Sequence, residues 1–125
     1  MPRTRIKICG IRDVDTALAA ADAGADAIGF MFHPKSVRFI EPEEAADIAV
    51  MLPPLVSTVA VFVNPTLERF MDIEEACPTT HTQLHGEESA ELVRECAPVI
   101  KAVGLDPIWV GVLACIMLQT SYLTP

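Results

Sequence analysis

The sequence has no excess of basic residues, no closely paired cysteines and no long apolar run, and each absence excludes a class of protein. Only 9 Lys and Arg stand against 17 Asp and Glu, which gives a formal net charge of −8. Such a charge would repel both a nucleic-acid backbone and an anionic membrane surface, so we expect neither as a partner. A small anionic ligand remains compatible with it, because a few placed arginines or helix N-termini can bind one.

The cysteines show no metal-binding or disulfide spacing. They are Cys9, Cys77, Cys96 and Cys115. None stands in a CxxC pair, so neither a zinc site nor a disulfide framework is predicted, and a reducing, cytoplasmic location fits best. The first ten residues lack the apolar core of a signal peptide. The most apolar stretch, residues 108–118, is shorter than the roughly 20 residues that span a bilayer.

What is present is a regular alternation of two kinds of segment in a chain that is 51% hydrophobic. Short segments rich in β-branched and apolar residues, with Gly, Asn or Pro at their ends, predict strands. These segments are residues 5–10, 27–32, 57–64, 80–86 and 98–103. The segments between them have apolar residues at helical spacing, so they are expected to form helices.

The first two helices carry clear start and stop signals. Asp13 is the expected N-cap of the first, and Gly24 stands where a glycine would end it. Pro42 and the two glutamates after it form a first turn that suits the helix dipole.

The signals for the third and fourth helices are of the same kind. Asn64 and Pro65 are expected to cap and begin the third helix, and Glu87 and Glu88 to lie in the first turn of the fourth. The expected buried faces consist of Leu67, Phe70 and Met71 in the third helix and Leu92, Val93 and Cys96 in the fourth.

Strands that alternate with helices predict a parallel sheet and hence the α/β class. No GxGxxG follows the first strand, whereas polar residues collect where the strands end, which is the face where (β/α)8 TIM barrels place their chemistry. We therefore expect an incomplete barrel of about four and a half βα units in residues 1–103, followed by a divergent apolar tail in residues 104–125.

Five motifs in the right order resemble one enzyme family. They are KICGIRD at 7–13, GADAIGFMFHPKSVRFI at 24–40, VAVFVNP at 59–65, QLHGEE at 83–88 and IKAV at 100–103. Together they resemble the N-terminal half of the phosphoribosylanthranilate isomerases of tryptophan biosynthesis. The resemblance implies a (β/α)8 barrel that performs an Amadori rearrangement of a phosphorylated aminoaldose to an aminoketose, without a metal or organic cofactor.

The resemblance also implies roles for individual residues. The cysteine of the family's K-x-C-G motif is the general base, and it matches Cys9. Lys7, two residues back on the same side of the strand, would favour the thiolate. The arginine of the S-x-R-x-I segment holds the anthranilate carboxylate and matches Arg38, whose guanidinium suits a planar anion. From the residues alone, a cysteine such as Cys9 is more often a buried space-filler, and a loop arginine such as Arg38 is more often a solvated surface charge.

Gln83 and His85 alternate on the fourth strand, so they face the same way. The resemblance implies that both lie at the substrate-facing rim, while the alternative is an internal hydrogen-bonded pair. The family's general acid, an aspartate in a later strand, and its glycine-rich phosphate loops have no match here. Asp106 is the only acid after Val103, and its context differs from the family motif.

Three readings follow from these patterns. The first is an isomerase of this family, impaired because the acid and phosphate loops are unmatched. The second is a non-catalytic half-barrel that self-associates through its open edges or needs a complementary C-terminal half. The third is another phosphosugar barrel, which the K-x-C-G motif disfavours.

Overall fold

A computed structural model describes residues 3–96 and 98–101 of the chain. The predicted boundary at Val103, the predicted tail at 104–125 and Asp106 lie outside the described residues.

The described chain alternates strands and helices throughout, which confirms the α/β class. The strands are β1 (Lys7–Cys9), β2 (Ala27–Met31), β3 (Ser57–Phe62), β4 (His81–Leu84) and β5 (Val99–Lys101). The helices are α1 (Val14–Asp22), α2 (Pro42–Ala49), α3 (Leu67–Ala76) and α4 (Ala90–Glu95). Each strand lies within one of the five segments predicted to form strands.

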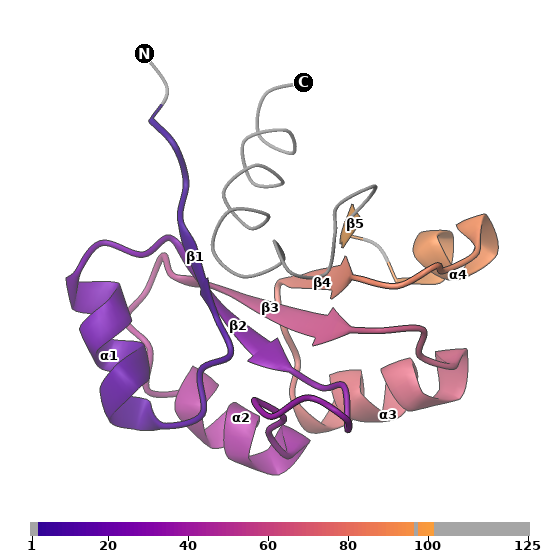
Figure 1. The fold of residues 1–125 in the computed structure, drawn as a ribbon. Coiled ribbons are helices and arrows are strands. Elements are labelled where there is room, and N and C mark those ends of the chain that lie inside the picture. The colour runs from indigo at the N-terminus through magenta and orange to yellow at the C-terminus, as the bar shows by residue number, and fades with distance from the viewer. Residues whose placement is uncertain (1–2, 97, 102–125) are drawn as a thin grey trace.

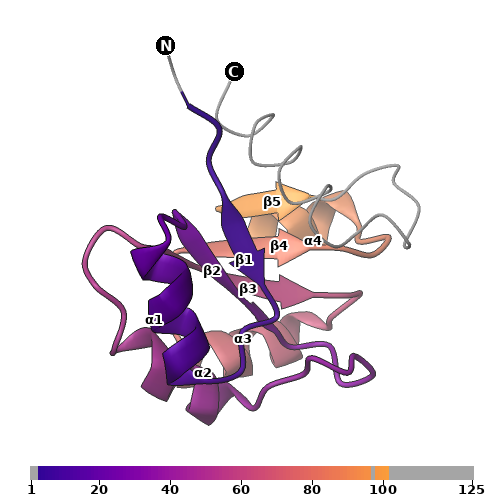
Figure 2. The ribbon, with the colours of Figure 1, turned by 60° about the vertical axis from the view of Figure 1, so that its left-hand side comes forward.

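The strands form one sheet in the order β1-β2-β3-β4-β5, and every neighbouring pair is parallel. Parallel strands are joined by right-handed crossovers. Because each strand here lies next to the preceding one and on the same side of it, these crossovers place every connecting helix on the same face of the sheet. Figures 1 and 2 show α1, α2 and α3 together on one side of the strands. This one-sided arrangement is that of a (β/α) barrel, whereas a doubly wound sheet reverses its strand order and carries helices on both faces.

The main hydrophobic core lies between the sheet and the helices. Alternate strand residues such as Ile28, Phe30 and Phe62 are buried there at 0–1% exposure. Phe62 also makes an edge-to-face contact with Phe70 of α3, with ring centroids 5.6 Å apart. Phe70, predicted to lie on the buried face of the third helix, is thus a core residue.

The opposite face of the sheet is more polar. Ala27, Val59 and Val61 form a small second cluster on it, against which Cys9 and Met31 pack. Lys7 of β1 is also buried and bonds Gln83 of β4. In a flat sheet, three interstrand spacings would separate β1 from β4 by roughly 14 Å. A direct contact therefore indicates that the sheet curls toward this face, as a barrel wall does.

The predicted start and end of the first helix and the predicted start of the second are confirmed. The Asp13 carboxylate accepts hydrogen bonds from the backbone N–H and the hydroxyl of Thr16, which lowers the pKa of Asp13. Gly24 follows the end of α1 with φ +102°, a conformation that favours glycine. Pro42 begins α2 as expected.

The predicted starts of α3 and α4 are wrong. Thr66 caps α3 through its side chain, which accepts a bond from the N–H of Arg69, and Ser89 caps α4 in the same way. In each helix the hydroxyl accepts the N–H three residues further on, which is the usual N-cap geometry. Met71, predicted to be buried, is 59% exposed, and Ile73 takes its place in the core.

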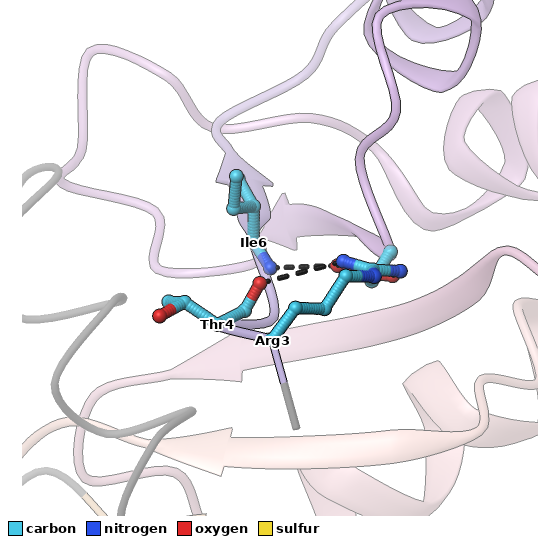
Figure 3. A network of polar contacts seen from close by, with 4 residues as sticks. Arg3, Thr4 and Ile6 are labelled. Carbon is cyan, nitrogen blue, oxygen red and sulfur yellow. Dashed lines mark hydrogen bonds and ion pairs between the residues drawn. The ribbon is translucent and has the colours of Figure 1, made fainter. Parts of the chain in front are cut away.

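The segment before β1 is tied to the start of β2. Asp26 accepts the N–H of Ile6 and forms an ion pair with Arg3, which lowers the pKa of the Asp26 carboxyl. Figure 3 shows Arg3 and Ile6 beside Thr4 in this network. In residues 3–96 and 98–101, no helix is long and apolar enough to cross a membrane.

Candidate active site

All strands are parallel, so their C-terminal ends and the loops that follow them meet at one edge of the sheet. The predicted site residues occupy this edge or the face just below it. Cys9 ends β1, Arg38 lies in the loop after β2, and Gln83 and His85 stand at the end of β4.

Cys9 is partly exposed at the end of its strand. The neighbouring strand makes room for its thiol with a glycine, because a β-carbon at Gly29 would lie 3.1 Å from Cys9 Sγ. Cys77 and Cys96, the two core cysteines, are buried against the helices, and this burial raises the pKa of each to about 11. Among the three cysteines that the structure describes, Cys9 is therefore the one that is not fully buried.

The loop after β2 folds back on itself and fixes Arg38. The N–H of Ile40 returns to the carbonyl of Met31 at 3.1 Å, and the Ile40 side chain is buried. The Ser36 hydroxyl accepts the backbone N–H of Arg38 at 3.1 Å. This turn explains why the S-x-R-x-I spacing matters: the serine holds the backbone of the arginine, and the isoleucine anchors the end of the loop.

Arg38 extends over the loop after β1. A β-carbon at Gly10 would lie 2.5 Å from Cδ and 3.0 Å from Nε of Arg38, so the arginine packs directly on this glycine. Gly10 has φ +80°, and its N–H bonds the carbonyl of Gly29 at 3.0 Å. The structure thus brings Arg38 against the residue that follows Cys9, although 29 positions separate Cys9 from Arg38 in the sequence.

Gln83 and His85 form one end of a hydrogen-bonded chain. Gln83 is 2% exposed, and its Oε1 accepts a hydrogen bond from the Lys7 ammonium. Its Nε2 lies 3.0 Å from Nδ1 of His85. The internal pair that the sequence left open is therefore present, and it includes Lys7 as a third member.

Sequence reasoning missed a polar clasp between the loops after β3 and β4. The Glu88 carboxylate accepts the N–H groups of Asn64 and Gly86 at 2.9 Å each, and the Asn64 side chain accepts the N–H of Glu87. Asn64 is held at φ +46°. The clasp lies next to His85 in the sequence, and its hydrogen bonds hold the C-terminal end of β4 in place beside that of β3. The one available signal is that Asn64 and Glu88 follow the ends of two neighbouring strands, but the sequence analysis assigns both residues to helix starts.

A groove between α3 and α4 is lined by Leu67, Ser89, Glu91, Leu92, Arg94 and Glu95, and holds none of the predicted site residues. Within residues 3–96 and 98–101, no three His, Cys, Asp or Glu side chains are grouped as a metal site.

The arrangement defines a class of protein. It is a (β/α) barrel-type fold that holds a thiol, a guanidinium and a buried polar chain at the C-terminal edge of its strands, which suits proton transfer on a small anionic substrate. The sequence model of the N-(5'phosphoribosyl)anthranilate (PRA) isomerase family matches residues 6–108. The chain belongs to this family.

Individual relatives agree with this assignment. The N-(5'-phosphoribosyl)anthranilate isomerase of Thermotoga maritima is 50% identical over 105 residues, which are 82% of this chain and 51% of that protein. The enzyme of Pseudomonas aeruginosa is 45% identical over 111 residues, which are 86% of this chain and 51% of the relative. The chain thus spans about half the length of the curated relatives it matches.

Solved structures show the same fold. The crystal structure of the Thermotoga maritima isomerase superposes with a TM-score of 0.79 at 49% identity, over 82% of this chain and 52% of that one. A second phosphoribosylanthranilate isomerase structure, in complex with reduced 1-(o-carboxyphenylamino)-1-deoxyribulose 5-phosphate, also has a TM-score of 0.79, at 48% identity over 83% of this chain and 55% of the other.

Proposed function

We propose that the chain takes part in the isomerisation of N-(5'-phosphoribosyl)anthranilate in tryptophan biosynthesis, with Cys9 as general base and Arg38 as carboxylate anchor. The observation that carries the proposal is the packing of Arg38 on Gly10, directly after Cys9. A group that binds the aryl carboxylate and a group that moves a proton must act on one small molecule, and here two distant segments meet to supply them.

Cys9 acts on the opened, Schiff-base form of the sugar. Its thiolate takes the proton from C2, the C2–H electron pair forms a C1–C2 double bond, and the protonated imine nitrogen accepts the displaced pair. The resulting enolamine then becomes the ketone. The imine is itself the electron sink, so the protein has to supply an acid, a base and anion-binding groups. The acid that opens the ribose ring is not assigned to any described residue.

Arg38 binds the carboxylate at the other end of the substrate. Its guanidinium matches a planar carboxylate in a bidentate pair, which a lysine cannot form. Support comes from the related structure with bound reduced 1-(o-carboxyphenylamino)-1-deoxyribulose 5-phosphate, a ligand that carries both an aryl carboxylate and a phosphate. His85 and Gln83 are the further residues proposed to serve binding, with His85 partly exposed and the buried Gln83 bonded behind it.

We further propose that the chain associates with a second polypeptide, and that the two meet at an open sheet edge. In the described residues, β1 pairs with β2 alone and β5 with β4 alone, so one edge of each is available. The partner is a second copy or a complementary C-terminal half. One related structure is of monomers generated from the dimeric Thermotoga maritima enzyme. A cytoplasmic location belongs to the same proposal.

The test is growth of a tryptophan auxotroph that lacks this isomerase. The strain expresses the 125-residue chain, alone or beside the C-terminal half of the Thermotoga maritima enzyme. Cys9→Ala and Arg38→Ala are compared with Cys96→Ala and with Arg94→Ala, an exposed arginine of α4.

Growth that requires Cys9 and Arg38 but neither control residue supports the proposal, whether or not the added half is needed. Growth of the Cys9→Ala chain contradicts the role of Cys9. Absence of growth in every combination, with the chain present at wild-type abundance, contradicts the isomerase proposal and favours a non-catalytic half-barrel.

A further inference from the structure

We propose that Lys7 is a positioning residue that sets the tautomer of His85 through Gln83. Lys7 orients the Gln83 amide, and the amide in turn makes Nδ1 of His85 a hydrogen-bond acceptor, so that the imidazole carries its proton on Nε2. The inference rests on the proposed function only for its consequence, which is that His85 offers an N–H donor to the oxygen-rich substrate.

The first step is the direction of the contact between Lys7 and Gln83. An ammonium group has three donors and no acceptor, so it can bond only the oxygen of an amide. Lys7 is 4% exposed and Gln83 is 2% exposed, which leaves little water to compensate for a wrong orientation. The bond from Lys7 Nζ to Gln83 Oε1 therefore fixes which end of the amide faces β1.

The second step follows from the other end of the same amide. Gln83 Nε2 lies 3.0 Å from Nδ1 of His85. An amide nitrogen can only donate, so Nδ1 must accept and cannot carry a proton. A neutral imidazole with an unprotonated Nδ1 carries its proton on Nε2.

The alternatives are disfavoured by the same burial. Rotating the amide would set its NH2 group against the ammonium and leave two buried donors facing each other. Protonating His85 on Nδ1 would place an N–H against the NH2 group of Gln83, so that two donors would again face each other. The hydrogen bond from Lys7 of β1 to Gln83 of β4 joins residues 76 positions apart. The protonation of the His85 ring nitrogens therefore depends on a strand that is remote in sequence.

The experiment is nitrogen-15 NMR of the imidazoles in the full 125-residue chain, labelled at histidine. The spectrum separates protonated from unprotonated ring nitrogens, and His85→Gln assigns the signals. His33 and His81 serve as internal controls in the same sample. We expect an unprotonated Nδ1 and a protonated Nε2 for His85, and a protonated Nδ1 would overturn the proposal.

Two variants test the role of Lys7. Lys7→Met keeps a long stem and removes the donor, so the Gln83 amide is no longer oriented and the His85 signals move toward a mixture of tautomers. Gln83→Glu keeps the acceptor for Lys7 and places an acceptor against Nδ1, so the proton moves to Nδ1. Should Lys7→Met fail to fold, as its backbone amide spectrum would show, Lys7→Gln takes its place, because an amide can accept as well as donate and so no longer dictates the orientation of the Gln83 amide.

His85 signals unchanged from the wild type in a folded variant of either kind would overturn the proposal. The readout is independent of catalysis, so loss of the isomerase proposal would leave the tautomer result standing, and the reverse also holds.

Discussion

Replacing Gly10 with alanine separates the role of Arg38 from that of backbone conformation. Gly10 has φ +80°, where a side chain costs about 1–2 kcal/mol. The new β-carbon would also lie 2.5 Å from Arg38 Cδ, which is roughly 1 Å closer than carbon atoms approach comfortably. The arginine must therefore move away from the residue beside Cys9.

Gly24→Ala is the matched control. Gly24 has φ +102°, and a β-carbon there would meet no atom within 4 Å. It should lose stability to a similar extent, and a cost of about 1–2 kcal/mol lowers the urea midpoint of a small domain by about 1 M. Gly24 lies at the end of α1, away from the proposed site, so ligand binding should be unchanged.

The assay combines urea unfolding, followed by circular dichroism, with calorimetric titration of reduced 1-(o-carboxyphenylamino)-1-deoxyribulose 5-phosphate. A charged hydrogen-bonded pair contributes about 1.5–3 kcal/mol, so displacing Arg38 should weaken binding by about 10- to 100-fold. We expect this loss in Gly10→Ala alone. If both variants lose stability and Gly10→Ala binds the ligand as tightly as the wild type, the placement of Arg38 does not serve binding and the reasoning is refuted.

Three further predictions concern other parts of the chain. Iodoacetamide should alkylate Cys9 long before the two core cysteines, whose burial raises their pKa to about 11; peptide mass spectrometry checks this, and equal labelling would contradict it. Asp26→Asn should destabilise the fold by less than about 1 kcal/mol at neutral pH. Because the folded pKa of Asp26 is lowered, its contribution is present above the unfolded pKa of about 3.9 and is lost as pH falls through the folded value. Thermal unfolding of both proteins should therefore converge in acid, and a constant difference would exclude the ion pair as its cause. Gly86→Ala would place a β-carbon 2.6–2.7 Å from the Asn64 amide and should cost about 1–3 kcal/mol in urea unfolding; an unchanged midpoint would show that the clasp contributes nothing.

The fold was predictable because its signals are local. Buried strands such as STVAVFVN stand out by their β-branched residues. The N-cap Asp13 immediately precedes α1, and Pro42 is the first residue of α2. A one-sided parallel sheet then follows from the uniform handedness of crossovers. The starts of α3 and α4 were mispredicted because several residues near each start could serve as caps, and Asn64 and Glu88 instead bond each other's loops.

The sequence predicts which residues belong to the candidate site better than it predicts the contacts among them. Cys9 and Arg38 came from motifs, and their roles stay predictions. The packing of Arg38 on Gly10 and the bond from Lys7 to Gln83 depend on how the sheet curls and how the loop after β2 folds back. These are long-range properties that no local pattern of residues encodes.

The central claim is that Cys9 is the general base, and the most direct test is the isomerisation rate of the purified chain assembled with the C-terminal half of the Thermotoga maritima enzyme. We expect Cys9→Ala to lower kcat/KM by about 10²- to 10⁴-fold, with ligand affinity retained, while Cys96→Ala changes stability and leaves the rate of the folded assembly unaltered. A Cys9→Ala assembly that turns over at the wild-type rate would contradict the account.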